Sequence, residues 1–196
     1  LLHRTYKVKK GDVILVHAAA GGMGLILCQW ARALGAVVIG TVSTQEKAEV
    51  ARDAGCDYPV VRSEQNFVSV VREITDGEGC AVVYEAIGKE TLQKSLDSLR
   101  NMGVCAAYGH VSGPPDPIDV IRDLGRRGSL FITRPAIMHY VAKRSDLEWT
   151  ARELFQAIRQ GNIDANINYE YPLREAVRAH ESIESGQTLG ASVLIP

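Results

Sequence analysis

Residues 12–35 combine a short apolar run, a glycine-rich turn and an amphipathic segment, and this order constrains the fold more than any other feature of the chain. The run at 13–16 contains only Val, Ile and Leu, which is typical of a parallel strand buried on both faces. Gly35 is placed to end a helix in a left-handed conformation, and residues 37–41 form a second apolar run. The stretch therefore predicts a strand–helix–strand unit with a right-handed crossover. Its helix has one apolar face, formed by Leu27, Trp30, Ala31 and Leu34.

The glycine turn indicates phosphate binding. Glycines let the backbone approach a pyrophosphate closely, and the unpaired amides of the following helix point at the anion. In the usual G-x-G-x-x-G fingerprint, the first position is Ala19 here, Gly21 and Gly24 hold the other two, and Gly22 is extra. Three glycines alone would also fit a purely structural turn. The strand before them and the helix after them favour a dinucleotide site.

Strands and helices continue to alternate after this unit. Such alternation predicts an α/β fold with a doubly wound parallel sheet. We expect a Rossmann-type domain of six strands over residues 1–134, with its ligand outside the carboxyl ends of the strands. The remaining strands are expected at 58–61, 80–84, 103–108 and 129–133, the helices at 66–75 and 91–99, and a Gly- and Pro-rich loop at 109–117.

The pattern changes after Arg134-Pro135. The remaining elements are too few for another doubly wound unit. They are a long helix at about 146–160, a stretch at 163–171, a second helix at 173–185 and a strand at 191–195. We therefore expect residues 135–196 to belong to a different layer whose other half is missing. The chain begins with Leu, and residues 1–6 are typical of the end of a helix that began earlier, which suggests a piece of a longer protein.

Composition excludes several function classes. A net charge of −1 gives no electrostatic case for nucleic acid or an anionic membrane, and no apolar run reaches the length of a membrane span. The N-terminus does not have the pattern of a signal peptide. The four cysteines are far apart, so we expect reduced core residues, a cytoplasmic protein and no zinc site: Cys28, Cys56, Cys80 and Cys105.

The residues after the second strand favour NADPH over NADH. NAD-binding units place an acid about 20 residues past the glycines, and residues 39–44 hold none. Glu46 lies three residues after Ser43, a spacing better explained by a helix capping box. A 2′-phosphate flanked by Ser43, Lys47 and Arg62 would be well satisfied. The alternatives are that Ser43 only caps the helix and that the two cations are ordinary surface residues.

Several motifs resemble NADPH:quinone oxidoreductase, the zeta-crystallin-like branch of the zinc-independent medium-chain dehydrogenase/reductases. They span essentially the whole chain: VHAAAGGMG at 16–24, QWARALG at 29–35, IGTV at 39–42, FITRP at 131–135 and GASVLIP at 190–196. The resemblance implies that an N-terminal, GroES-like catalytic half is absent here and that residues 135–196 return to complete it. It also implies a homodimer that pairs through the sixth strand.

The resemblance implies a set of cofactor contacts. The family's 2′-phosphate lysine falls on Lys47, its tyrosine or histidine near the phosphate falls on Arg62, and a further family arginine falls on Gly186, so that contact is expected to be lost. His110 is either a cofactor contact or an exposed loop histidine. The full set of expected cofactor-binding residues is Ala20, Gly21, Gly22, Met23, Gly24, Ser43, Lys47, Arg62, Ala86, Tyr108, Gly109, His110, Phe131, Ile132 and Thr133.

The resemblance implies hydride transfer from NADPH to a quinone or a related α,β-unsaturated carbonyl without a covalent nucleophile, and no catalytic residue is assigned in this chain. His17, at the end of the first strand, is interpreted as a residue for packing or turn formation rather than for catalysis. Because half of the active-site wall is expected to be missing, we expect this chain to bind cofactor with little turnover. One alternative is an enoyl or alkenal reductase of the same superfamily. Another is a non-catalytic NADPH-binding crystallin or RNA-binding module, for which the chain has no basic stripe.

Overall fold

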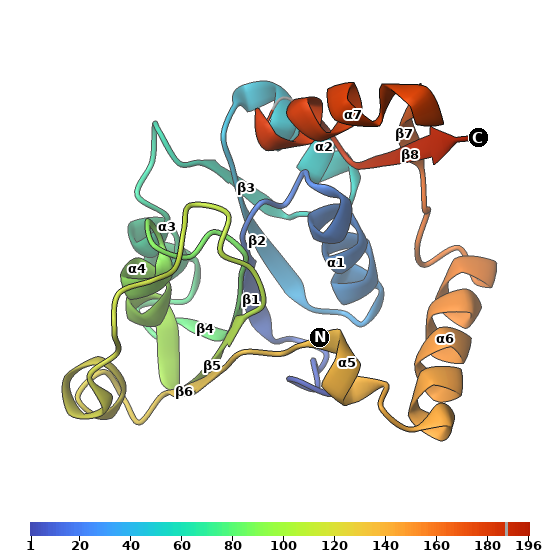
Figure 1. The fold of residues 1–196 in the computed structure, drawn as a ribbon. Coiled ribbons are helices and arrows are strands. Elements are labelled where there is room, and N and C mark those ends of the chain that lie inside the picture. The colour runs from blue at the N-terminus through green and yellow to red at the C-terminus, as the bar shows by residue number, and fades with distance from the viewer. Residues whose placement is uncertain (187) are drawn as a thin grey trace.

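Six strands form one parallel sheet in the order β3-β2-β1-β4-β5-β6 (Figure 1). The computed structural model describes residues 1–186 and 188–196. This strand order confirms the predicted Rossmann-type doubly wound sheet. The strands are β1 (Val13–Val16), β2 (Val37–Val42), β3 (Tyr58–Val61), β4 (Cys80–Glu85), β5 (Leu99–Ala107) and β6 (Phe131–Thr133).

The strand order reverses beside β1, which pairs with β2 on one side and with β4 on the other. Leu15 lies in register with Ile39 and Val83, and all three side chains are fully buried, as expected for the centre of a parallel sheet. The chain crosses from β3, at one edge, to β4 in the middle. The crossover opens a crevice outside the carboxyl ends of the strands, where ligands bind in sheets of this kind.

Helices cover both faces of the sheet (Figure 1). On one face, α1 (Gly22–Ala33) and α2 (Gln45–Asp53) enclose an apolar cluster that contains Leu27 and Ala51. On the other, α3 (Phe67–Ile74) and α4 (Leu92–Asp97) enclose a second cluster that contains Phe67 and Leu96. Gly35 follows α1 with φ of 81°, which confirms the predicted left-handed helix end. The four cysteines are buried and free, as predicted.

Two local expectations were wrong. Ser43 does not cap α2; Thr44 is the N-cap, and its hydroxyl accepts from the Lys47 amide at 3.3 Å. The segment expected to be helical through residue 99 ends at Asp97, and β5 begins at Leu99. Residues 2–5 form turns, and the expectation that an earlier helix ends in this stretch stays a prediction. A π-helix, Val120–Gly125, follows the predicted loop, and its first turn is capped by the carboxylate of Asp119.

The C-terminal segment, from residue 135 onward, forms a separate two-stranded parallel sheet with flanking helices. In Figure 1, α7 and β8 lie beside α2 and the start of α1, and α6 lies apart from the six-stranded sheet. No helix in the described part of the chain is both long and apolar enough to cross a bilayer. The domain boundary at 134 stays a prediction. The elements are α5 (Ile137–Tyr140), α6 (Arg144–Arg159), β7 (Ile167–Pro172), the 3-10 turn η2 (Leu173–Glu175), α7 (Ala176–Glu184) and β8 (Ala191–Ile195).

Candidate functional site

Most residues predicted to bind cofactor lie at the carboxyl edge of the sheet. The glycine turn follows β1, Ser43 and Lys47 follow β2, and Arg62 follows β3. Ala86 and the segment 108–110 follow β4 and β5. Because parallel strands end at the same edge, the fold gathers these residues from five chain positions into one region. The exception is 131–133, which forms strand β6 itself.

The glycine turn is built closely against the preceding backbone. The Gly21 amide donates to the Ala18 carbonyl at 2.9 Å, and the Ala19 amide donates to the Thr41 carbonyl at 3.0 Å. A Cβ at Gly24 would lie 2.7 Å from Cα of Ala19, so only glycine fits there. The first turn of α1 carries no side-chain cap, which leaves its amides for an anion. The turn therefore fits a bound pyrophosphate.

The C-terminal segment contacts this turn directly, a relationship that the sequence did not predict. The Gly190 amide donates to the Ala20 carbonyl at 3.0 Å, and Gly21 forms a parallel bridge with Gly190. A Cβ at Gly22 would lie 3.3 Å from the Gly190 carbonyl oxygen. One role of Gly22 is thus to admit this segment.

The two cations predicted for the 2′-phosphate follow adjacent strands but have different partners. Lys47 Nζ donates to the Gly186 carbonyl at 2.5 Å. The Arg62 amide donates to the Val42 carbonyl at 3.1 Å, and its guanidinium lies 3.6 Å from a carboxylate oxygen of Glu90. Gly186 is the position at which the family resemblance implied the loss of an arginine. Its backbone carbonyl is the hydrogen-bond partner of Lys47.

Arg62 also lines a cavity of about 450 Å³ between the loops that follow β3 and β4. The cavity wall is mostly polar and carries both signs of charge, so it suits a polar ring or ribose better than a purely apolar group. The lining residues are Arg62, Ser63, Glu64, Gln65, Asn66, Phe67, Glu90, Thr91 and Lys94.

The loop after β5 is fixed by backbone contacts. The amides of Tyr108 and Gly109 donate to the Glu85 carbonyl at 2.9 and 3.2 Å, and burial raises the pKa of Tyr108. A Cβ at Gly109 would lie 2.9 Å from Cα of Ala86. His110 is exposed, and its Nδ1 lies 3.1 Å from a guanidinium nitrogen of Arg134. Sequence reasoning did not find Arg134, whose only signal is its position directly after β6.

A buried hydrogen-bonded chain below the crevice was also missed. His17 is fully buried, and both of its ring nitrogens have partners: Nδ1 lies 2.7 Å from Thr41 Oγ1 and Nε2 lies 2.9 Å from Ser95 Oγ. Ser95 donates to Glu85 Oε2 at 2.5 Å. Burial lowers the pKa of His17, so the ring is neutral. Burial alone would raise the pKa of Glu85, but the positive charge that His17 gains when it is protonated, the Ser95 hydrogen bond and two backbone amides hold it below its ordinary value.

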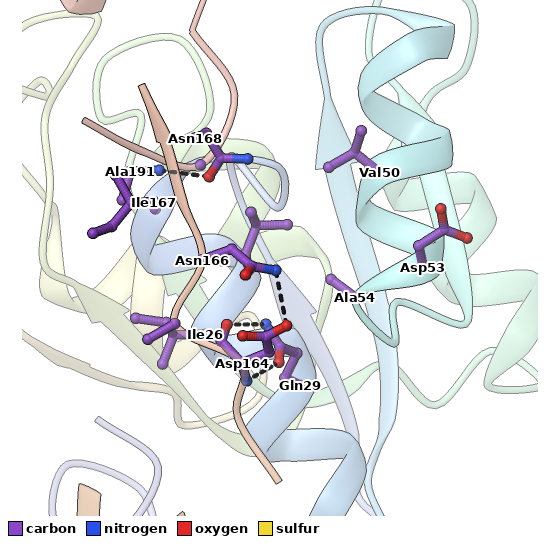
Figure 2. Close-up of a pocket in the computed structure, with 14 residues that line it drawn as sticks. Ile26, Gln29, Val50, Asp53, Ala54, Asp164, Asn166, Ile167, Asn168 and Ala191 are labelled. Atoms are coloured by element: carbon purple, nitrogen blue, oxygen red, sulfur yellow. Dashed lines mark hydrogen bonds between the residues drawn. The ribbon is translucent and has the colours of Figure 1, made fainter. Parts of the chain in front are cut away.

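A second cavity, of about 340 Å³, lies where the C-terminal segment crosses α1 and α2 (Figure 2). Gln29 joins this segment to α1: the Asp164 amide donates to its side-chain oxygen at 2.6 Å, and its side-chain nitrogen donates to the Asp164 carbonyl at 3.2 Å. Of the predicted cofactor residues, only Gly22 lines this cavity. It is therefore distinct from the crevice.

Together, a parallel sheet of this order and a glycine turn at its reversal point define a Rossmann-type α/β protein. The chain belongs to the zinc-binding dehydrogenase family, whose model matches residues 22–153. The described residues do not fit a zinc ion, because they include no group of three or more His, Cys, Asp or Glu side chains able to hold a metal.

The chain is similar to reductases along its full length. It is 58% identical to a 2-haloacrylate reductase of Burkholderia sp, covering 100% of this chain and 59% of that protein. It is 44% identical to a quinone oxidoreductase of Salmonella typhimurium, with 100% and 60% covered. The structure of Escherichia coli quinone oxidoreductase in complex with NADPH matches with a TM-score of 0.95 and 42% identity, covering 100% of this chain and 60% of that chain. This chain thus spans about 60% of these relatives.

Proposed function

We propose that this chain binds NADPH in the crevice at the carboxyl edge of the sheet. The observation that carries the proposal is the uncapped N-terminus of α1, which follows a glycine turn too tight for a side chain at Gly24. Residues 20–24 would hold the pyrophosphate, and Lys47 and Arg62 the 2′-phosphate. The remaining predicted contacts, Ser43, Ala86, Tyr108, Gly109, His110, Phe131, Ile132 and Thr133, would surround the rest of the cofactor.

We propose that the protein to which this chain belongs is an NADPH-dependent reductase of a quinone or a related α,β-unsaturated carbonyl. When bound, NADPH supplies the hydride, so the residues of this chain bind and orient the cofactor. The quinone oxidoreductases among the similar proteins support this acceptor class. The 2-haloacrylate reductase supports a second candidate, an acrylate with an electron-poor double bond. In either case we propose that groups that bind the acceptor lie outside this chain.

The test is a calorimetric titration of this chain with NADPH, followed by addition of a simple quinone or 2-chloroacrylate to the complex. We expect saturable NADPH binding at one site and little oxidation of NADPH with either acceptor. Absence of NADPH binding would overturn the proposed function. Rapid NADPH oxidation by this chain alone would overturn the proposal that acceptor-binding groups lie elsewhere, and the faster acceptor would identify the substrate class.

We also propose a homodimer that pairs through β6, in a reducing, cytoplasmic environment. β6 is the last strand of the six-stranded sheet, and Phe131 on it keeps 59% of its surface exposed. An edge strand with an exposed aromatic residue is suited to pairing with a second copy. Sedimentation of this chain and of a Phe131→Lys variant tests the dimer: we expect the variant to be monomeric, and a monomeric unmodified chain would contradict the proposal.

A further inference from the structure

Glu85 connects the two loops that follow β4 and β5, although it has no exposed surface itself. Its Oε1 accepts from the amides of Ile87 and Gly88 at 2.7 and 3.1 Å and from the Thr91 hydroxyl at 2.9 Å, which fixes the loop after β4. Its backbone carbonyl accepts from the amides of Tyr108 and Gly109, which fixes the start of the loop after β5. One residue thus sets the position of both loops.

The other carboxylate oxygen of Glu85 connects these loops to β1 and β2. The Ser95 hydroxyl donates its hydrogen bond to Glu85, so the Ser95 oxygen is free to accept from Nε2–H of His17. In that neutral ring, Nδ1 then accepts from the Thr41 hydroxyl. His17 directly precedes the glycine turn, and the Thr41 carbonyl accepts from the Ala19 amide within that turn. The chain of hydrogen bonds therefore extends under the crevice from the turn to both loops. Every member is partnered, as a rigid buried network requires.

The two sides of the crevice face different parts of a dinucleotide. Lys47 and Arg62 follow β2 and β3, on one side of the reversal point. The loops held by Glu85 follow β4 and β5, on the other side. A dinucleotide bound across the reversal point has one half on each side. If the 2′-phosphate of the adenosine half lies at Lys47, the nicotinamide half lies against the loops that Glu85 holds.

We propose that Glu85, through Ser95 and His17, is a positioning residue for the nicotinamide half of NADPH. The inference rests on the proposed function and adds to it a residue that does not touch the cofactor. Removal of the carboxylate leaves the three donors of the loop after β4 without their acceptor and releases that loop, while the backbone carbonyl still holds the start of the loop after β5. The adenosine half, held on the other side, keeps its contacts.

The experiment compares two ligands: NADPH, and adenosine 2′,5′-bisphosphate, which lacks the nicotinamide half. Both are titrated into the unmodified chain and into Glu85→Ala. We expect Glu85→Ala to bind NADPH roughly tenfold more weakly while bisphosphate affinity stays the same. Glu85→Gln is the conservative variant, since its oxygen still accepts from the loop and the chain of hydrogen bonds can reverse through the other His17 tautomer. We expect Glu85→Gln to restore most of the NADPH affinity.

A matched control separates positioning from general stability. Asp123 is another buried carboxylate; it accepts from the Asp119 amide at 2.9 Å and lies next to Arg127, which pairs with Asp97 at the end of α4 away from the crevice. We expect Asp123→Asn to lower the unfolding temperature and leave both ligand affinities unchanged. Ser95→Ala replaces Glu85→Ala in the experiment if Glu85→Ala does not fold. Nε2 of His17 lies 3.4 Å from Oε2 of Glu85, so these two groups can pair directly when the serine hydroxyl is removed. It should show a smaller loss of NADPH affinity in the same direction.

Each outcome supports or contradicts a specific claim. If the unmodified chain does not bind NADPH, the proposed function fails. If the unmodified chain binds NADPH and the variants weaken both ligands equally, or neither, the positioning role of Glu85 is wrong while the proposed function stands. Selective loss of NADPH affinity in Glu85→Ala or Ser95→Ala supports the inference.

Discussion

Lys47, on the first turn of α2, donates from Nζ to the carbonyl oxygen of Gly186 at 2.5 Å. This contact joins the six-stranded sheet to the C-terminal segment at the place where the 2′-phosphate is proposed to bind. A phosphate at this place must share or replace the Gly186 carbonyl as the partner of the lysine. If the phosphate binds there as proposed, the position of the C-terminal segment and the preference for NADPH are linked through one side chain.

The N-cap of α2 gives a test of the local structure. Thr44→Ala removes the hydroxyl that accepts from the Lys47 amide and should lower the free energy of unfolding by about 1 kcal/mol. Ser43→Ala is the matched control and should leave stability nearly unchanged. Urea unfolding of both variants measures the difference. A larger loss in the Ser43 variant would restore the capping box predicted from the sequence.

The glycine turn gives a second test. A Cβ at Gly24 collides with the backbone of Ala18 and Ala19, so Gly24→Ala should displace the start of α1 and cost about 1–3 kcal/mol of stability as well as NADPH affinity. At Gly21 the added Cβ would lie 3.3 Å from the Ala18 carbonyl oxygen, a much milder contact. Gly21→Ala should therefore be the less harmful of the two in thermal unfolding and NADPH titration. Equal effects would contradict the close packing at Gly24.

Because His17 is buried, we predict that the free energy of unfolding falls in mild acid. Burial lowers its folded-state pKa below the ordinary value of 6.5, so the unfolded chain takes up a proton that the folded chain does not. This contribution to stability is complete above about pH 6.5 and is lost as the pH falls toward the folded-state pKa. Glu85, whose pKa is also lowered, loses its contribution only below its ordinary value of 4.5.

Urea unfolding between about pH 7.5 and about pH 5.5 measures this effect. His17→Gln should be less stable at the upper pH but should lose less stability on acidification than the unmodified chain. His3 also has a pKa lowered by burial, so His3→Gln shows how much of the pH dependence arises elsewhere. An identical pH dependence in the unmodified chain and in His17→Gln would show that His17 does not carry the effect.

The sheet was predictable because its strands are short apolar runs separated by glycines and amphipathic helices. All of these features are local in the sequence. The shift of the N-cap from Ser43 to Thr44 was not, since adjacent hydroxyl residues fit the same spacing to within one position. The π-helix at Val120–Gly125 follows a Gly- and Pro-rich stretch that carries no helical periodicity.

Within the candidate site, the residues after each strand were predictable because the fold brings all carboxyl ends to one edge. Their contacts were not. Glu85, His17 and Ser95 come from three elements, and no spacing rule connects a buried acid on β4 with a histidine after β1. The Lys47–Gly186 contact joins residues 139 positions apart, so it appears only once the chain is folded.

The most direct measurement of the central claim is the ratio of the NADH and NADPH dissociation constants of this chain, determined by calorimetry at one salt concentration. We predict that the unmodified chain binds NADPH roughly tenfold or more tightly than NADH, because a charge-assisted hydrogen bond to the 2′-phosphate contributes about 1.5–3 kcal/mol. Lys47→Ala should bring the ratio close to one, and Arg62→Ala should reduce it. Lys7→Ala is the control: Lys7 precedes β1 and so belongs to the opposite edge of the sheet, and its removal should leave the ratio unchanged. Equal binding of the two cofactors by the unmodified chain, or a ratio that survives Lys47→Ala, would contradict the account.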